Sequence, residues 1–160
     1  MLGPVDDPWL DESQRAAWVK LISVVELLPG VLETQLRRDS GLTHFEYFVL
    51  AMLSEAPERT LRMTALAERV NATLPRLSHV VHRLEDRTLV ERFPCPEDRR
   101  ATNVRLTDAG WSTIVGAAPG HVATVRKYVI DALSAEQIGQ MDEIMTALLE
   151  NLDPQARMSP

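Results

Sequence analysis

The sequence has 160 residues, enough for one compact domain or a small domain with a helical appendage. The net charge of −6 argues against a uniformly basic nucleic-acid-binding protein, and no apolar run reaches the roughly 18–20 residues of a membrane span. The single cysteine, Cys95, excludes an internal disulfide, and residues 1–7 lack the basic and apolar regions of a signal peptide, so we expect a cytoplasmic protein.

The N-terminal third of the chain predicts two helices. Asp11 is a good N-cap with Gln14 three residues later, and apolar residues recur at helical spacing from there to about residue 38. Gly41 is expected to end this helix. Thr43 and Glu46 form a second capping-box pattern, which predicts a helix to about residue 54.

The middle of the chain predicts short elements in the order strand, helix, helix, strand, strand. These elements are expected at residues 60–63, 64–70, 74–87, 89–93 and 102–106. Thr73 is expected to cap the longer helix, and the Pro-rich segment 94–101 is expected to form a hairpin loop. Two helices joined by a short turn and followed by a two-stranded hairpin are the winged-helix arrangement.

Two further helices are predicted at the C-terminal end. Thr107 is a good N-cap for a helix that we expect to reach about Leu133. Ser134 and Gln137 form a third capping-box pattern, which predicts a last helix to about residue 151.

The predicted helix at 74–87 has an apolar stripe opposite a basic face. The stripe is about 120° wide and is made of Leu74, Leu77, Val80, Val81 and Leu84. In a helix-turn-helix, the N-terminal half of the second helix contacts base edges in the major groove. The candidates for base contacts there are Arg76, Ser78 and His79, and those for phosphate or neighbouring bases are His82 and Arg83. An ordinary amphipathic helix with a solvated basic face is the alternative.

Basic residues are concentrated around this helix. From Arg59 to Arg105 the sequence has ten arginines and six acidic residues, although the whole chain is acidic. Attraction to phosphate depends on the charge within about one Debye length rather than on the total charge. The composition is therefore compatible with DNA binding, with an arginine-rich solvated surface as the alternative.

The end of the hairpin carries a recognisable motif. Residues 98–110 read Asp-Arg-Arg-Ala-Thr-Asn-Val-Arg-Leu-Thr-Asp-Ala-Gly and resemble the MarR family signature Asp-x-Arg-x-x-x-Val-x-Leu-Thr-x-x-Gly. The fixed positions all match, at Asp98, Arg100, Val104, Leu106, Thr107 and Gly110. Residues 84–92 are similar to the family's exit from the recognition helix, and the resemblance covers about residues 11–152. It departs at Thr88, where glycine is usual. A residue larger than glycine disfavours a left-handed turn at this position.

The resemblance implies a regulator that binds duplex DNA as a homodimer, most simply a repressor on a pseudo-palindromic operator. Arg100 at the hairpin tip is expected to enter the minor groove, where narrow stretches concentrate negative potential. Asp98 is expected to pair with Arg100 and orient it, and Arg99 to meet the DNA backbone. The alternative function is a winged-helix module that binds a protein and has no affinity for DNA.

The predicted fold class is mainly α with a small β-wing. The resemblance assigns residues 43–106 to a winged helix-turn-helix DNA-binding domain, and residues 11–42 and 107–152 to a helical dimerisation region. The last helices carry more apolar residues than a small winged domain needs: Leu133, Ile138, Met141, Ile144, Met145, Leu148 and Leu149. Their number supports a partner surface, as expected for a homodimer.

Members of the family commonly bind small aromatic or anionic molecules between the dimer helices and the winged domain. The candidates for lining such a cleft are Trp18, His44, Tyr47, Phe48 and Trp111. Aromatic residues that simply fill the core are the alternative interpretation.

Other chemistry has less support. Cys95, in a wing that we expect to be exposed, is a candidate redox sensor, with an incidental thiol as the alternative. The four histidines have no recognisable metal-ligand spacing, so no metal or cofactor is expected. A phosphate loop, a nucleophile elbow and a Cys–His signature are all missing, so we expect no enzymatic activity.

Overall fold

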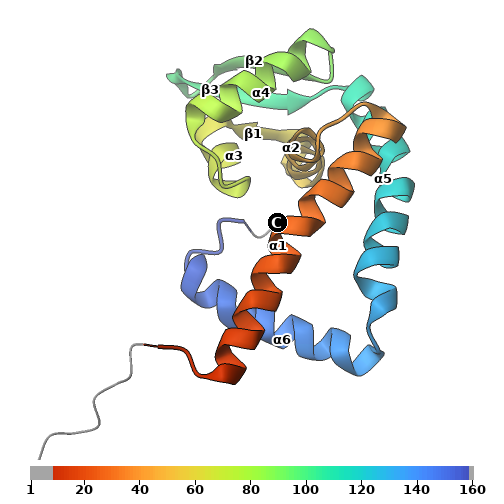
Figure 1. The fold of residues 1–160 in the computed structure, drawn as a ribbon. Coiled ribbons are helices and arrows are strands. Elements are labelled where there is room, and N and C mark those ends of the chain that lie inside the picture. The colour runs from red at the N-terminus through yellow and green to blue at the C-terminus, as the bar shows by residue number, and fades with distance from the viewer. Residues whose placement is uncertain (1–8, 159–160) are drawn as a thin grey trace, which may run out of the picture.

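The computed structural model describes residues 9–158 (Figure 1). The segment 1–7, in which no signal peptide was expected, lies outside these residues. Between residues 9 and 158 the chain forms six α-helices and one three-stranded sheet. The elements are α1 (Glu12–Ser40), α2 (His44–Glu55), β1 (Thr60–Arg62), α3 (Met63–Arg69), α4 (Leu74–Asp86), β2 (Val90–Cys95), β3 (Asp98–Leu106), α5 (Asp108–Tyr128) and α6 (Ala135–Leu152). The predicted order and the mainly helical fold class are confirmed.

The elements form two regions (Figure 1). The sheet and α2, α3 and α4 gather at one end, and the long helices α1 and α5 pack side by side and lead away from it. α6 crosses the far end of these two helices. Every helix between residues 9 and 158 is too short or too polar to traverse a lipid bilayer.

A single hydrophobic cluster fills the winged region. It joins side chains of α2, α3, α4 and the sheet to Ile114 of α5. α4 contributes Leu77, Val80, Val81 and Leu84, as its apolar stripe predicts. Leu74 is the exception, since it begins the helix and is 45% exposed.

The sheet has the order β1-β3-β2, and both pairs are antiparallel. The hairpin strands reach further than predicted, because Pro94 pairs with Thr102 and Cys95 with Asp98. A proline is tolerated at this position because β2 is an edge strand, where one side of the backbone makes no ladder hydrogen bonds. The expected loop at 94–101 is therefore mostly strand, with a turn at its centre.

α5 is shorter than predicted. It ends at Tyr128, and residues 130–132 form a single 3₁₀ turn before Ser134 caps α6. The β-branched pair Val129–Ile130 is unfavourable in a helix, and the turn lets Asp131 accept a 2.9 Å hydrogen bond from Arg126.

The join between α4 and the wing has a left-handed residue. Thr88 adopts φ 58°, so the left-handed turn forms here although a side chain larger than glycine disfavours it. The N–H groups of Thr88 and Leu89 donate to the carbonyls of Glu85 and Leu84, a Schellman motif that ends α4. The Thr107 hydroxyl also donates to the Thr88 carbonyl at 2.7 Å. These three hydrogen bonds hold a β-branched residue where glycine is usual.

Gly110 joins the base of the wing to α5. A Cβ atom at Gly110 would lie 2.1 Å from the Leu89 carbonyl oxygen and 2.6 Å from Leu106 Cδ1. The Thr107 side chain accepts from the Gly110 N–H, and the Thr107 N–H donates to the same Leu89 carbonyl. Only glycine allows the first turn of α5 to lie this close to the wing.

Candidate DNA-binding interface

The exposed face of α4 carries the basic residues predicted for DNA contact. Thr73 caps the helix, with its hydroxyl accepting from the Arg76 N–H at 3.4 Å. Arg76, His79, His82 and Arg83 are all exposed, on the side opposite the buried stripe. The local sequence thus gives a helix that buries one face and presents cations on the other.

Arg76 is held in place without losing its donors. Its guanidinium carbon lies 4.3 Å from the centre of the Phe45 ring on α2. Stacking uses the flat face of a guanidinium and leaves the N–H groups at its edge free to bind. This geometry suits a fork that donates to guanine O6 and N7.

Ser78 lies in a polar cluster between α4 and the wing. It is half-buried, and its hydroxyl accepts from Arg92 of β2 at 3.5 Å. Arg92 also binds Glu85 of α4 through its side chain at 2.7 Å and its backbone N–H at 2.8 Å. Burial alone would raise the pKa of Glu85, but these bonds and the charge of Arg92 hold it below its usual value. The cluster ties the recognition helix to the wing.

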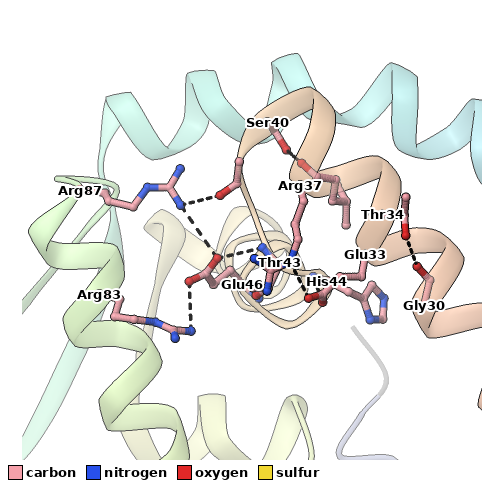
Figure 2. Close-up of polar contacts among 12 residues, drawn as sticks. Gly30, Glu33, Thr34, Arg37, Ser40, Thr43, His44, Glu46, Arg83 and Arg87 are labelled. Carbon is pink, nitrogen blue, oxygen red and sulfur yellow. Dashed lines mark hydrogen bonds and ion pairs between the residues drawn. The ribbon is translucent and has the colours of Figure 1, made fainter.

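Arg83 meets a carboxylate on α2 that sequence reasoning treated only as part of a helix cap (Figure 2). Its Nη2 lies 3.1 Å from Glu46 Oε1, and Arg87 Nη1 lies 3.9 Å from Oε2. Glu46 is almost fully buried, with a side-chain exposure of 7%. No local pattern predicts this contact, because the partners lie on different helices and are 37 residues apart.

The wing tip presents two arginines. Asp98, Arg99 and Arg100 are all exposed. Asp98 Oδ1 accepts from the backbone N–H of Arg100 at 3.1 Å, and no ion pair joins their side chains in the part of the chain that the structure describes. The expected pairing of the two side chains is therefore wrong. An aspartate readily bonds the N–H two residues later, and here that leaves the guanidinium outside the turn.

Cys95 is buried, with 2% of its surface exposed, so the expectation of an exposed thiol is wrong. The pairing of β2 and β3 is irregular at Pro94–Cys95, and the side chain turns inward there. Its Sγ accepts from Arg62 at 3.4 Å and lies 3.5 Å from Glu97 Oε2. The premise of the redox-sensor hypothesis, an accessible thiol, is thus absent.

The five candidates for an effector cleft do not form one cluster. His44 and Tyr47 lie near His121 of α5, which sequence reasoning did not place there, and the Tyr47 and His121 rings are 4.4 Å apart. Burial lowers the pKa of both histidines, and the charge of His44 lowers that of His121 further.

The two tryptophans lie elsewhere. Phe48 lies one turn after His44 on α2 and, like Tyr47, packs partly buried against the winged core. Trp18 is 52% exposed and lies on α1 about 22 Å along the helix from Glu33, which accepts from the His44 N–H. Trp111 contacts Arg59, whose guanidinium is 4.0 Å from its ring. A cleft between the two regions remains a prediction for His44, Tyr47 and Phe48, which lie together on α2.

Large apolar side chains are exposed along the helices outside the winged region. They include Val24, Val25 and Leu27 of α1, Val115 and Val122 of α5, and Ile144, Met145, Leu148, Leu149 and Leu152 of α6. Such an extensive exposed apolar surface is typical of a protein–protein interface.

Comparisons with known proteins agree with this geometry. The family model described as "MarR family" matches residues 42–102, which contain all the predicted DNA-contacting residues. The crystal structure of Sco3205, a MarR family transcriptional regulator from Streptomyces coelicolor in complex with DNA, is 42% identical in sequence, with a TM-score of 0.87. The match covers 91% of this chain and 95% of that one. This chain belongs to the MarR family.

Two other solved structures extend the comparison. AbsC, also a MarR family transcriptional regulator from Streptomyces coelicolor, is 36% identical, with a TM-score of 0.86 over 91% of this chain and 98% of that one. The transcriptional regulator BldR from Sulfolobus solfataricus is 19% identical, with a TM-score of 0.72 over 86% and 99% of the two chains, and shares the fold. The MarR resemblance and the winged-helix fold predicted from the sequence are confirmed.

Proposed function

We propose that this MarR family chain is a DNA-binding transcriptional regulator, a cytoplasmic homodimer that represses nearby genes from a pseudo-palindromic operator. The supporting observation is that two separate elements present exposed arginines. Arg76 lies on the recognition helix and Arg100 at the wing tip, and the Arg92–Glu85 contact links the two elements. A protein-interaction module would not need both groups. The DNA complex of Sco3205 supports the same proposal by relationship.

The packing of the helices supports a division of the chain into two regions. Residues 43–106 would form the DNA-binding domain, and residues 11–42 and 107–152 the dimerisation region. The exposed apolar side chains of α1, α5 and α6 support a second copy as the partner. We expect a native mass of two chains, and Ile144→Glu should shift it towards one. A monomeric wild type would exclude the dimer.

The decisive experiment is binding to the DNA upstream of the chain's own gene across a salt series. Wild type should bind selectively, and Arg100→Ala should lose about 1–3 kcal/mol of operator affinity. The matched control is Arg126→Ala, which removes the same charge beyond the winged region, where Arg126 pairs with Asp131. If wild type binds selectively and Arg100→Ala and Arg126→Ala weaken that binding equally, Arg100 acts only through the total charge of the protein. No selective binding by wild type would favour the interaction module.

An effector is the remaining part of the proposal. The cluster of His44, Tyr47 and His121 joins α2 to α5 and offers imidazoles and a phenol to an aromatic or anionic molecule. An aromatic carboxylate such as benzoate should weaken operator binding by wild type and should act less on His44→Gln. Equal effects on both proteins would place any effector site elsewhere.

A further inference from the structure

We infer that Glu46 is a positioning residue for DNA recognition, whose negative charge fixes the recognition helix α4 on α2 by binding Arg83 and Arg87. The inference rests on the proposed DNA-binding function. It assigns Arg83 to the support of α4 instead of to a phosphate contact.

One carboxylate joins three segments of the chain (Figure 2). Glu46 Oε1 meets Arg83 at 3.1 Å, and Oε2 accepts from the Thr43 N–H at 2.9 Å and lies 3.9 Å from Arg87. Arg87 also donates to the carbonyl of Gly41 at 3.1 Å. The end of α1, the first turn of α2 and the C-terminal half of α4 therefore meet at Glu46.

The helix cap alone does not require a charge at this position. The structure has two other capping boxes, and both are closed by glutamine, Gln14 in α1 and Gln137 in α6. A glutamine oxygen accepts the same backbone hydrogen bond as a carboxylate. Glu46 differs in being nearly buried and facing two arginines, and a buried carboxylate is tolerated only when it is paired. Its charge therefore serves the contact with α4.

The first turn of α2 holds α4 at two points. Phe45 lies against Arg76, and its neighbour Glu46 binds Arg83, seven residues later. Seven residues are about two turns, or roughly 10 Å, along the same face of a helix. Two contacts at that separation fix both the position and the tilt of α4, and so the direction in which Arg76 reaches a base.

The same turn of α2 is anchored on its other side by α1. Glu33 Oε2 accepts from the His44 N–H at 3.1 Å, and Arg37 binds the other oxygen of Glu33 at 2.7 Å (Figure 2). Polar contacts therefore run without a break from α1 through α2 to the recognition helix. A phosphate that captured Arg83 would leave the buried Glu46 without its nearest charged partner.

The test compares selectivity and salt dependence in three variants. Glu46→Gln keeps an oxygen for the cap and removes the charge, and Arg83→Ala removes the partner. Each should lower the ratio of operator to non-specific affinity by roughly tenfold, the loss of about one base contact. The double variant should lose little more, because both changes break the same contact. Glu68→Gln removes a charge on the exposed face of α3 and should leave the ratio unchanged.

The salt series separates support from direct contact. Each phosphate contact adds about 0.9 to the slope of log affinity against log salt. Arg83→Ala should leave the wild-type slope unchanged, whereas Arg100→Ala should make it shallower. A shallower slope for Arg83→Ala, or an unchanged selectivity ratio for a folded Glu46→Gln, would overturn the inference. If Glu46→Gln does not fold, the slope and selectivity of Arg83→Ala decide the question.

The two proposals fail in different ways. Wild type that binds all DNA alike would end both the proposed function and this inference. If wild type binds the operator selectively and Glu46→Gln is equally selective, only the inference about Glu46 is wrong.

Discussion

Replacing Gly110 with alanine should destabilise the protein by about 2 kcal/mol. The new Cβ atom would lie 2.1 Å from the Leu89 carbonyl oxygen and 2.6 Å from Leu106 Cδ1, well inside ordinary contact distance. The first turn of α5 must therefore move by about 1 Å from the base of the wing. This movement lengthens the 3.1 Å hydrogen bond from the Thr107 N–H to the same carbonyl.

Three contributions set the magnitude. Overpacking a well-packed contact costs about 1–3 kcal/mol. The weakened hydrogen bond costs about 1 kcal/mol. Alanine returns about 1 kcal/mol through its higher helix propensity. The net cost is about 1–3 kcal/mol, which is large beside the stability of a small domain.

Urea unfolding at one fixed protein concentration measures this cost. Gly116→Ala is the matched control, because it lies in the same helix and its Cβ atom would meet nothing within 4 Å. The control should gain about 0.5–1 kcal/mol from helix propensity alone. If Gly110→Ala were as stable as wild type or more stable, the close approach of α5 to the wing would not exist in solution.

Two further changes test the conformation of Thr88 and the burial of two histidines. Thr88→Gly should raise stability by about 0.5–1 kcal/mol. The strain that φ 58° imposes on a threonine costs more than the extra conformational freedom that glycine gives the unfolded chain. A lower urea midpoint would show that the Thr88 side chain stabilises the turn. Burial lowers the pKa of His44 and His121 below 6.5, so the unfolded chain binds more protons than the folded one at pH values below 6.5. The contribution of these histidines to stability should be complete above pH 6.5 and should fall as the pH drops below that value. His121→Gln should therefore show a smaller change in urea midpoint between pH 7.5 and 5.5 than wild type. An equal change in wild type and His121→Gln would contradict the assignment of this pH dependence to His121.

Local signals predicted the starts of five helices correctly. Asp11, Thr43, Thr73, Thr107 and Ser134 each cap a helix in the structure. A cap depends on three or four consecutive residues, so its pattern is fully contained in a short stretch of sequence. The signature around the wing allowed the family to be predicted for the same reason.

Contacts between distant segments could not be predicted in this way. The pairing of Arg83 with Glu46 depends on how α4 packs on α2, and the burial of Cys95 depends on a shift in strand pairing. Similarly, nothing in the spacing of Trp18 and Trp111 indicates that they lie far from His44. These positions are set by tertiary packing, which a one-dimensional pattern does not contain.

The attachment of the wing to α5 gives the hairpin a long lever arm. Arg100 lies six residues along β3 from Leu106, or about 20 Å from the base of the wing. Because Gly110 and Thr107 hold that base against the first turn of α5, the hairpin must follow any rotation of this turn. A rotation of about 10° would move Arg100 by about 3–4 Å, more than half the roughly 6 Å width of a minor groove. A small tilt of one helix is thus enough to move the wing tip by about half the width of the groove that we propose it enters.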